Sequence, residues 1–266
     1  MQQGFKNKVV WITGASSGIG EGLVNAFAQQ GAKIILSARR ESELKRVAQQ
    51  TNLKEENYLI LPFDLADTSK AYVYVEQILR QFGRIDILVN NGGYSQRAEA
   101  KDTPLDIDRQ LMEVNYFSAI ALTKSVLPVM IKQQGGQLVV ISSVSGKFGF
   151  YLRSSYSAAK HALHGFFETL RLETEKQGIK TLLVCPGKIK TNISFAAVTA
   201  DGKQHNRMDE SHKHAMSSAE CAGIILNAIQ KGEEEILVGG KELKAVWLKR
   251  FFPKVFGKII RKQSPY

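Results

Sequence analysis

Seven short apolar segments alternate with amphipathic segments along almost the whole chain, and this alternation is what most constrains the fold. Each apolar segment is a nearly continuous run of hydrophobic residues, which is typical of a β-strand buried on both faces. These segments lie at residues 8–13, 32–38, 58–61, 85–89, 137–142, 180–184 and 235–238. Helical segments are expected between them at residues 18–30, 41–50, 68–82, 105–133, 154–177 and 217–231. The pattern predicts a parallel sheet covered by helices on both faces.

A chain of 266 residues with this pattern is expected to form one α/β domain rather than several. The expected architecture is a Rossmann-type, doubly wound parallel sheet of seven strands with right-handed crossovers. We assign residues 1–240 to this domain. Residues 192–216 interrupt the pattern before the last helix and read as an insert, and residues 241–266 read as a basic C-terminal extension.

Composition narrows the functional classes. The chain is 44% hydrophobic and 23% charged, as in an ordinary globular protein, and no apolar run approaches the ~20 residues that span a bilayer. No apolar signal core follows the N-terminal residues, so we expect an unprocessed cytoplasmic protein. Cys185 and Cys221 have no metal-binding or disulfide spacing, which fits a reducing compartment.

Most of the net charge of +11 lies in the C-terminal extension. Residues 241–266 contain eight Lys or Arg and one acid, Glu242, so the rest of the chain is nearly balanced. This distribution, without a nucleic-acid-binding motif, argues against a nucleic-acid partner. Bases and large apolar residues are mixed over residues 243–261, and Pro253 is expected to divide that segment into two short pieces. The segment either docks on the body or another subunit, or makes a peripheral contact with anionic lipid.

Ligands of doubly wound sheets bind beyond the carboxyl ends of the strands, so the residues that follow each strand are the candidates for a site. After the first strand comes TGASSGIG (residues 13–20). Its glycines allow close approach of a pyrophosphate to the backbone, and the following helix offers free N–H groups at its positive end. The candidate contacts in this loop are Gly14, Ser16, Ser17, Gly18, Ile19 and Gly20.

The residues after the second strand favour NADP(H) over NAD(H). A cofactor with a free ribose 2′-hydroxyl calls for a carboxylate at this position. Here the first polar side chains are Arg39 and Arg40, whose guanidinium groups suit a 2′-phosphate. Glu41 follows at once and could serve either the ribose or the start of a helix.

The remaining strand ends also carry polar or small residues. Asp64 and Leu65 follow the third strand, where Asp64 could contact an adenine or simply form a turn. Asn91 and Gly92 follow the fourth strand. Further along stand Ser143 and then Tyr156 and Lys160, which share a helix face at i, i+4 spacing, followed by Pro186, Gly187, Ile189 and Thr191.

Together, TGASSGIG, NNGG, Asn115, Ser143, Tyr156-x-x-x-Lys160 and Pro186-Gly187-x-x-x-Thr191 resemble the classical short-chain dehydrogenase/reductase (SDR) superfamily. Order and spacing match over about residues 5–240. NNGGYSQR and SAAKHALHGFF more narrowly resemble the dehydrogenase/reductase member 7-like subgroup, which shares the Gly92-Gly93 pair where most of the superfamily has NNAG.

The resemblance implies an NADP(H)-dependent oxidoreductase that interconverts a small-molecule carbonyl and a secondary alcohol. It implies a tetrad in which Tyr156 donates or accepts the proton, and Lys160 lowers the pKa of the Tyr156 phenol and holds the nicotinamide ribose. Ser143 would bind the substrate oxygen, and Asn115, in a distorted helix, would position a water. It also implies a homodimer or homotetramer, and a substrate lid formed by residues 192–216, with specificity shared by residues 94–97 and 147–153.

One other function stays open. A protein that binds NADPH and acts as a redox sensor with little turnover would keep the cofactor residues. Against it, all four residues of the tetrad are present. No metal site is expected, because no cysteine or ordered carboxylate set completes a ligand shell around His205, His212 and His214, while packing or surface roles suffice for His161 and His164.

Overall fold

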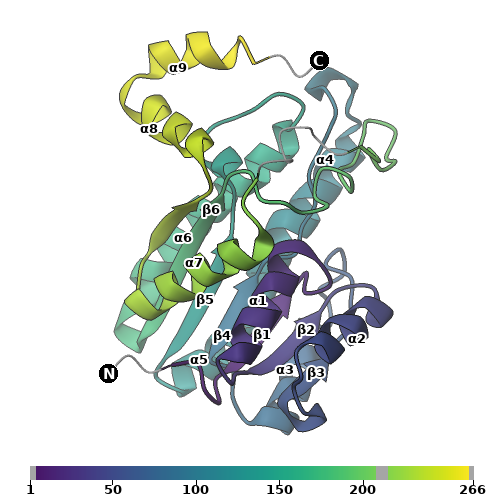
Figure 1. Ribbon diagram of the computed structural model, residues 1–266, viewed down its shortest axis with the longest axis vertical. Coiled ribbons are helices and arrows are strands. Elements are labelled where there is room, and N and C mark those ends of the chain that lie inside the picture. The colour runs from purple at the N-terminus through teal and green to yellow at the C-terminus, as the bar shows by residue number, and fades with distance from the viewer. Residues whose placement is uncertain (1–3, 208–214, 264–266) are drawn as a thin grey trace.

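All seven predicted strands belong to one sheet, and every registered pair in it is parallel. The structure is a computed structural model that describes residues 4–207 and 215–263. The strand order is β3-β2-β1-β4-β5-β6-β7, so the chain winds outward from β1 in both directions (Figure 1). The strands are β1 Val9–Thr13, β2 Lys33–Ser37, β3 Tyr58–Ile60, β4 Ile87–Asn90, β5 Gly136–Ile141, β6 Ile179–Pro186 and β7 Glu235–Val238. The predicted fold class is confirmed.

Helices cover both faces of the sheet and form the outer two of three layers (Figure 1). The main helices are α1 Gly18–Gln29, α2 Glu41–Gln50, α3 Ala71–Phe82, α4 Leu105–Met112, α5 Ser118–Lys132, α6 Ser154–Thr174, α7 Ser218–Lys231, α8 Lys244–Phe251 and α9 Pro253–Ile260. Shorter helical turns are η1 Glu55–Asn57, η2 Ala100–Asp102, η3 Glu113–Phe117, η4 Val144–Gly146, η5 Glu175–Gln177 and η7 Lys241–Leu243.

Two hydrophobic cores lie on opposite faces of the sheet, because successive side chains of a strand point to opposite sides. Val10 and Ile12 of β1 join α1, α2 and α7 in one core. Val9 and Trp11 join α3, α5 and α6 in the other. The indole N–H of buried Trp11 donates to the Ser37 hydroxyl (2.9 Å), so its polar atom has a partner in the core. Cys185 and Cys221 are both buried and free, as expected.

Helices α4 and α5 run on from one another through η3, a stretch of π-helix. By length and composition this continuous helix could cross a membrane. The sequence did not predict this property, because it has no long apolar run. Half of its most apolar window is buried, and Leu122, Val126 and Met130 belong to the core beneath the sheet. The helix is therefore a core element of the domain.

The insert and the C-terminal extension complete the chain. The described part of the insert returns to the strand ends, where Val198 bridges Gln96 and Met216 bridges Ile189. His212 and His214 lie outside the described residues. The extension forms α8 and α9, which project from one end of the domain (Figure 1). The helices part at Phe252, and Pro253 opens α9, so the predicted break at Pro253 is confirmed.

Candidate active site

The glycine-rich loop between β1 and α1 forms a cradle that side chains would fill. Gly14 and Gly18 have φ of +63° and +59°, a conformation that favours glycine. A Cβ on Gly14 would lie 2.8 Å from the Asn91 amide nitrogen, and one on Gly20 would overlap the Gly14 carbonyl oxygen. Ser17 caps α1 without using its side chain, so the free N–H groups at the helix start face this loop. The cradle fits a phosphate group.

The side chains of Thr13, Asn91 and Arg46 fix the shape of this loop, and the sequence predicted a role for Asn91 alone. The Thr13 hydroxyl accepts hydrogen bonds from the backbone N–H groups of Asn91 and Gly92 (both 3.0 Å). The Asn91 amide donates to the Thr13 carbonyl (2.9 Å) and so joins β4 to the loop. Arg46 of α2 donates to the Ser16 carbonyl (3.2 Å) and pairs with Glu21 (2.8 Å), bracing the loop from the next helix.

Both candidate 2′-phosphate ligands are exposed beyond the end of β2. Arg39 and Arg40 precede α2, and Arg40 occupies its N-cap position with no side-chain cap bond. Glu41 is the first residue of α2, where its carboxylate pairs with Lys45 at 2.7 Å. The sequence left two roles open for Glu41, a contact with the ribose and a place at the start of a helix. The structure shows Glu41 at the start of α2.

The β3 end shows how Asp64 and Leu65 are placed. The Asp64 carboxylate accepts from the backbone N–H of Ala66 (3.0 Å), which is the turn role considered for it. A Cβ on Gly92 would overlap the Leu65 side chain. Most of the superfamily has alanine at the position of Gly92. Leu65 fills the space that the alanine Cβ would need, so glycine fits at position 92 in this chain.

Tyr94 lies closer to the cofactor side than the sequence suggested. Its phenol oxygen is buried and has no hydrogen-bond partner among the described residues. Burial raises the pKa of Tyr94 to about 12, with Arg39 lowering it and Asp64 raising it further. Both charged groups stand at ends of strands assigned to the adenosine portion of the cofactor. The resemblance places Tyr94 among the substrate-specificity residues 94–97.

Asn115 lies within the π-helical segment η3, so the distortion expected around it is confirmed. Its side chain is buried and holds the β4–α4 loop, because Oδ1 accepts from the Tyr94 N–H (3.2 Å) and Nδ2 donates to the Tyr94 carbonyl (3.1 Å). Nδ2 also donates to the Leu111 carbonyl (2.9 Å), which the widened turn leaves available. A Cβ on Gly93 would overlap Asn115 Oδ1, so only glycine leaves this contact undisturbed.

Ser143 and Tyr156 meet at the carboxyl end of β5. Ser143 is the N-cap residue of η4, and its hydroxyl accepts from the Ser145 N–H (3.1 Å). Tyr156 is buried on α6. Burial raises the pKa of the Tyr156 phenol, and a hydrogen bond from Ser143 and the charges of Arg153 and Arg97 lower it only in part. The structure therefore brings the predicted pair together but gives Tyr156 a raised pKa, opposite to the predicted direction.

The position of Lys160 explains that difference. Its ammonium lies over the face of the Tyr156 ring, 5.7 Å from the ring centroid, and donates to the Ile141 carbonyl (2.8 Å). It is thus directed at the ring and the end of β5. Burial lowers the pKa of Lys160 to about 8, which the nearby Cys185 opposes. The sequence predicted the shared face correctly, but burial, which it did not reveal, dominates both groups.

His164 lies one turn beyond Lys160, where the sequence predicts only a packing or surface role. Its ring Nε2 is 3.0 Å from the Ser142 hydroxyl and 3.6 Å from Cys185 Sγ. Ser142 in turn donates to the Lys160 carbonyl (3.2 Å). These contacts fix the turn of α6 that carries Lys160. The signal that the sequence offers for it is a histidine at i+4 from the candidate lysine, on the same helix face.

His164, Glu168 and Glu235 also place three potential metal-ligand atoms within 4.8 Å of one another. A cation already occupies the position between two of them. Lys147 Nζ lies 2.6 Å from Glu235 and 3.2 Å from His164 Nδ1. Burial and Lys147 both lower the pKa of His164, which keeps the ring neutral beside this ammonium. The cluster is satisfied as an ion-pair network.

The residues after β6 reach both the glycine loop and the C-terminal extension. Thr191 Cγ2 would lie 3.0 Å from a Cβ on Gly18, and Ile189 is buried in the core. At Gly187 a Cβ would overlap the carboxylate of Glu242. Glu242 accepts from the backbone N–H groups of Lys188 (2.8 Å) and Gly240 (3.0 Å). The single acid of the extension thus anchors it beside the predicted Pro186–Thr191 contacts.

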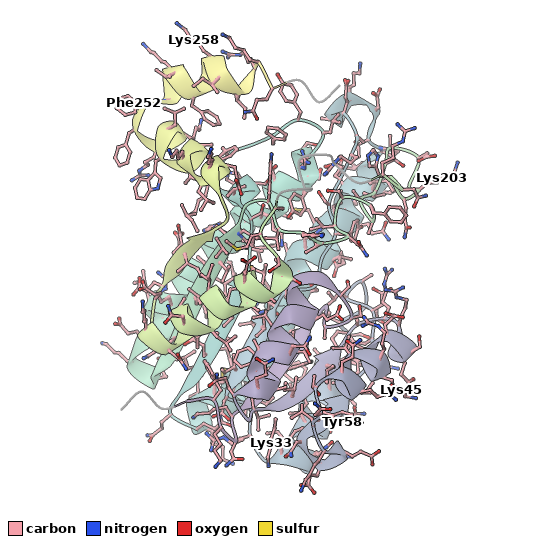
Figure 2. The ribbon with its side chains drawn as sticks, in the orientation of Figure 1. Lys33, Lys45, Tyr58, Lys203, Phe252 and Lys258 are labelled. Atoms are coloured by element: carbon pink, nitrogen blue, oxygen red, sulfur yellow. The ribbon has the colours of Figure 1, made fainter. Side chains whose placement is uncertain are left out.

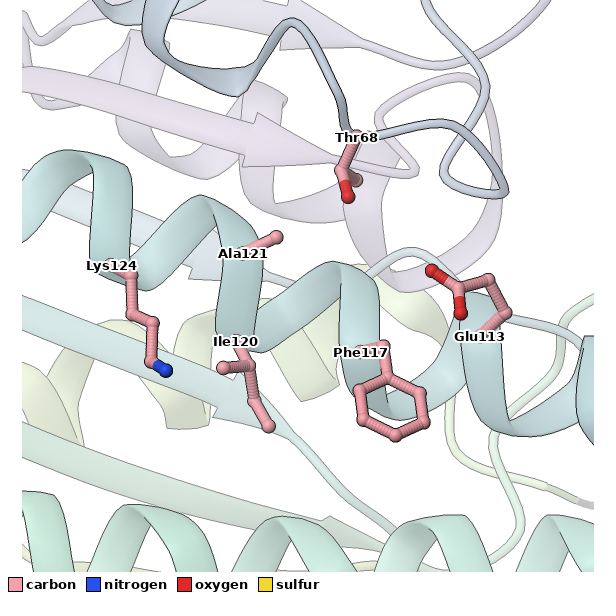
Figure 3. Close-up of a pocket in the computed structure, with 6 residues that line it drawn as sticks. All are labelled: Thr68, Glu113, Phe117, Ile120, Ala121 and Lys124. Atoms are coloured by element: carbon pink, nitrogen blue, oxygen red, sulfur yellow. The ribbon is translucent and has the colours of Figure 1, made fainter.

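A surface hollow of about 330 Å³ lies apart from these residues (Figure 3). It is lined by Thr68, Glu113, Phe117, Ile120, Ala121 and Lys124, mostly from one side of η3 and α5. Asn115 belongs to the same helical segment but is buried and faces Tyr94 instead. The hollow contains none of the candidate catalytic or cofactor residues, so it is not the active site.

Comparisons with known proteins agree with this geometry. Residues 8–201 match the family described as short chain dehydrogenase. The chain is 41% identical to "Dehydrogenase/reductase SDR family protein 7-like" of Anopheles gambiae over 98% of this chain and 84% of the relative. It is 37% identical to mouse "Dehydrogenase/reductase SDR family member 7B" (98% and 82% covered) and 42% identical to human "Dehydrogenase/reductase SDR family member 7" (90% and 69%).

Two crystal structures share the fold. A short-chain dehydrogenase from Streptomyces avermitilis superposes with a TM-score of 0.81 at 27% identity, covering 97% of this chain and all of that one. A short-chain dehydrogenase/reductase from Burkholderia phymatum, solved in complex with NAD, superposes with a TM-score of 0.83 at 21% identity, covering 95% and 96%. The similarity extends over nearly the whole domain in both cases.

Proposed function

The chain belongs to the short-chain dehydrogenase/reductase family, and on that premise we propose that it interconverts a carbonyl and a secondary alcohol with NADP(H). Family membership makes it an oxidoreductase that uses a nicotinamide cofactor. The observation that carries the finer proposal is the meeting of Ser143, Tyr156 and Lys160 at the end of β5, next to Asn115 and the glycine cradle.

Tyr156 supplies the proton in the proposed reduction. When bound, the cofactor supplies the hydride that reaches the carbonyl carbon. The phenol O–H of Tyr156 breaks as its proton passes to the substrate oxygen, and the reverse transfers oxidise the alcohol. Ser143 donates a hydrogen bond to the same oxygen and stabilises the charge that develops on it.

Lys160 and Asn115 support that proton transfer. A phenol loses its proton more easily when an ammonium stabilises the phenolate, and Lys160 lies over the Tyr156 ring. With a pKa of about 8, Lys160 is mostly protonated at neutral pH and can return a proton to Tyr156. We propose that Asn115, on the widened turn of η3, positions a water that connects Lys160 with solvent.

The cofactor would be held by the cradle and by the strand ends around it. Gly14, Gly18 and Gly20 leave room for the pyrophosphate, and the exposed Arg39 and Arg40 suit a 2′-phosphate. The Asp64 carboxylate accepts a hydrogen bond in a turn and Glu41 pairs with Lys45, so both nearby acids already have partners within the protein. These contacts support NADP(H) as the preferred cofactor.

The first test replaces the proton donor. We expect Tyr156→Phe to lower turnover by about 10²–10⁴-fold in an NADPH-oxidation screen over a panel of aldehydes and ketones, since the substrate oxygen loses its proton source. NADPH binding, followed by fluorescence titration, should persist. Retention of wild-type turnover would exclude Tyr156 as donor. If the wild-type protein bound NADPH and turned over no carbonyl or alcohol, a redox-sensing role would replace the proposed one.

The second test addresses cofactor preference. We expect Arg39→Ala to lower the ratio of NADPH to NADH affinity by on the order of tenfold or more, because a charge-assisted bond to the 2′-phosphate is lost. Arg80→Ala, an exposed arginine on α3 that pairs with Glu76, is the control and should leave the ratio unchanged. An unchanged ratio for Arg39→Ala would contradict the 2′-phosphate assignment.

A further inference from the structure

The C-terminal helices expose a group of large apolar side chains that we call the C-terminal patch. It consists of Trp247 and Phe251 on α8, Phe252 at the turn, and Val255 and Ile259 on α9. Trp247, Phe251 and Phe252 are 60%, 62% and 61% exposed. Figure 2 shows Phe252 where α8 gives way to α9, at the end of the molecule from which these helices project. A patch of this kind marks an interaction surface.

The patch is held in a defined arrangement. Phe256 is the buried residue of α9, and its ring packs edge-on against Phe148 of the loop after η4 (5.1 Å between centroids). The rings of Trp247 and Phe251 stack on each other at 5.9 Å and 3°. Phe256 and Glu242 fasten the extension to the body, so the side chains of the C-terminal patch stay exposed and can contact a partner.

Basic side chains line the patch. Successive residues of a helix are rotated by about 100°, so Arg250, Lys254 and Lys258 flank Phe251, Val255 and Ile259 respectively. Lys258 lies on the outer side of α9 (Figure 2). Residues 244–262 contain seven bases: Lys244, Lys249, Arg250, Lys254, Lys258, Arg261 and Lys262. Within residues 4–207 and 215–263, none of them forms an ion pair with an acidic side chain.

This charge decides between a second copy of the chain and another partner. A two-fold symmetric dimer places the same patch of both subunits face to face. Here that contact would bring two sets of seven bases together, and like-charge juxtaposition opposes association. The bases instead call for an anionic partner, while the aromatic side chains call for an apolar one. An anionic lipid bilayer offers both, with apolar chains just beneath its phosphates.

We propose that the C-terminal patch binds the surface of an anionic phospholipid bilayer. Trp247, Phe251 and Phe252 enter the level of the headgroups, where amphipathic helices place aromatic side chains, and the flanking bases contact the phosphates. Because Phe256 packs on Phe148, five residues from Ser143, this contact lies at the end of the molecule that carries the candidate active site.

The test is cosedimentation of the full chain with vesicles. Vesicles of phosphatidylcholine alone are compared with an equal mixture of phosphatidylcholine and phosphatidylglycerol. We expect binding to the mixed vesicles and little to the neutral ones, with release as NaCl rises from about 0.05 to 0.5 M because salt screens the bases. Absence of binding to the mixed vesicles at low salt would overturn the proposal.

Two variants test the patch from its apolar and its charged side. We expect Trp247→Ser/Phe251→Ser/Phe252→Ser to abolish sedimentation with the vesicles. Lys254→Gln/Lys258→Gln, which leaves the rings in place, should weaken the vesicle partition coefficient on the order of 25-fold. The matched control is Leu105→Ser/Ile224→Ser, which removes exposed apolar side chains of α4 and α7 from the body and should bind like wild type.

Both variants keep NADPH binding as a measure of folding, since the substituted side chains lie outside the cofactor residues. Wild-type vesicle binding by either patch variant would overturn the proposal. A second pair of results would also overturn it: the wild type does not bind vesicles, and analytical ultracentrifugation shows that the wild type is an oligomer and the apolar variant is not. The patch would then be a subunit contact.

Discussion

Tyr156 and Lys160 carry the proposed proton transfer, and both are buried on α6. Burial opposes the charged form of each side chain, so it raises the pKa of Tyr156 and lowers that of Lys160 to about 8. A lysine that is charged at neutral pH in this position destabilises the fold, and only the Ile141 carbonyl accepts a hydrogen bond from it among the described residues. Function is thus obtained at some expense of stability.

This argument predicts that Lys160→Met is inactive but more stable. We expect its free energy of unfolding at pH 7 to exceed that of wild type by about 1–2 kcal/mol, since methionine fills the space without a buried charge and loses only one hydrogen bond. Urea unfolding followed by circular dichroism measures the difference. A less stable Lys160→Met protein would show that the ammonium stabilises the fold.

The pH dependence of the same variant gives a second check. Because the folded pKa of Lys160 is about 8 and the unfolded one near 10.5, the unfolded chain binds more protons between these values. The destabilisation is complete below pH 8 and fades as the pH rises toward 10. Wild-type stability should therefore approach that of Lys160→Met across this window, whereas a constant difference would contradict the lowered pKa.

At the scale of elements, the C-terminal extension depends on one carboxylate. Glu242 accepts from two backbone N–H groups, at Lys188 after β6 and at Gly240 after β7. Burial alone would raise the pKa of Glu242, but these two N–H groups, together with the backbone of Glu242 itself and the charge of Lys188, outweigh it and the pKa is lowered. The extension is therefore held where β6 and β7 end, next to Gly187.

We predict that Glu242→Ala loosens the extension while the domain remains folded. Two backbone N–H groups lose their acceptor, which costs about 1–3 kcal/mol locally, toward the lower end because water can reach them. Limited trypsin digestion should cleave the basic extension faster. Glu242→Gln is the control, since its carbonyl oxygen can still accept. Equal digestion rates for wild type and Glu242→Ala would show that the apolar contact at Phe256 suffices.

Acid should have the same effect as the alanine substitution. A carboxyl whose folded pKa is lowered contributes its full stabilisation above its unfolded pKa, near 4.3, and loses it as the pH falls through the folded value. The wild-type extension should therefore stay anchored from pH 8 to 5 and loosen only as the pH falls below about 4.3, where the acid-active protease pepsin should cleave it faster.

At the scale of the whole molecule, we propose that the chain assembles as a homodimer or homotetramer. Large apolar side chains are exposed on the helical layer formed by α3, α5 and α6, among them Phe117, Ile131 and Leu172. The hollow beside Phe117 lies on the same layer (Figure 3). Unlike the C-terminal patch, this surface does not carry a run of bases in a single segment.

The assembly is tested by mass in solution. Sedimentation equilibrium should give two or four times the chain mass of 29.6 kDa. Phe117→Glu/Leu172→Glu should shift the protein toward the monomer, because it buries charge in the proposed contact. A monomeric wild type, or an oligomer unaffected by these substitutions, would rule out assembly through this layer.

Local sequence patterns were enough to predict the α/β class, all seven strands and the break at Pro253, because these depend on local periodicity and on residues with few allowed conformations. It also placed Tyr156 and Lys160 on one face of α6 and indicated the distorted helix at Asn115. Such features follow from spacings of a few residues, so a linear reading can identify them.

The contacts between these elements depend on how the whole chain folds. It brings Arg46 to the Ser16 carbonyl, Glu242 to Gly187 and Leu65 into the space above Gly92, across separations that no local pattern encodes. It also sets the directions in which the pKa values of Tyr156 and Lys160 move. Burial is the sum of everything packed around a group, from elements far apart in the chain, and therefore exists only once the chain has folded.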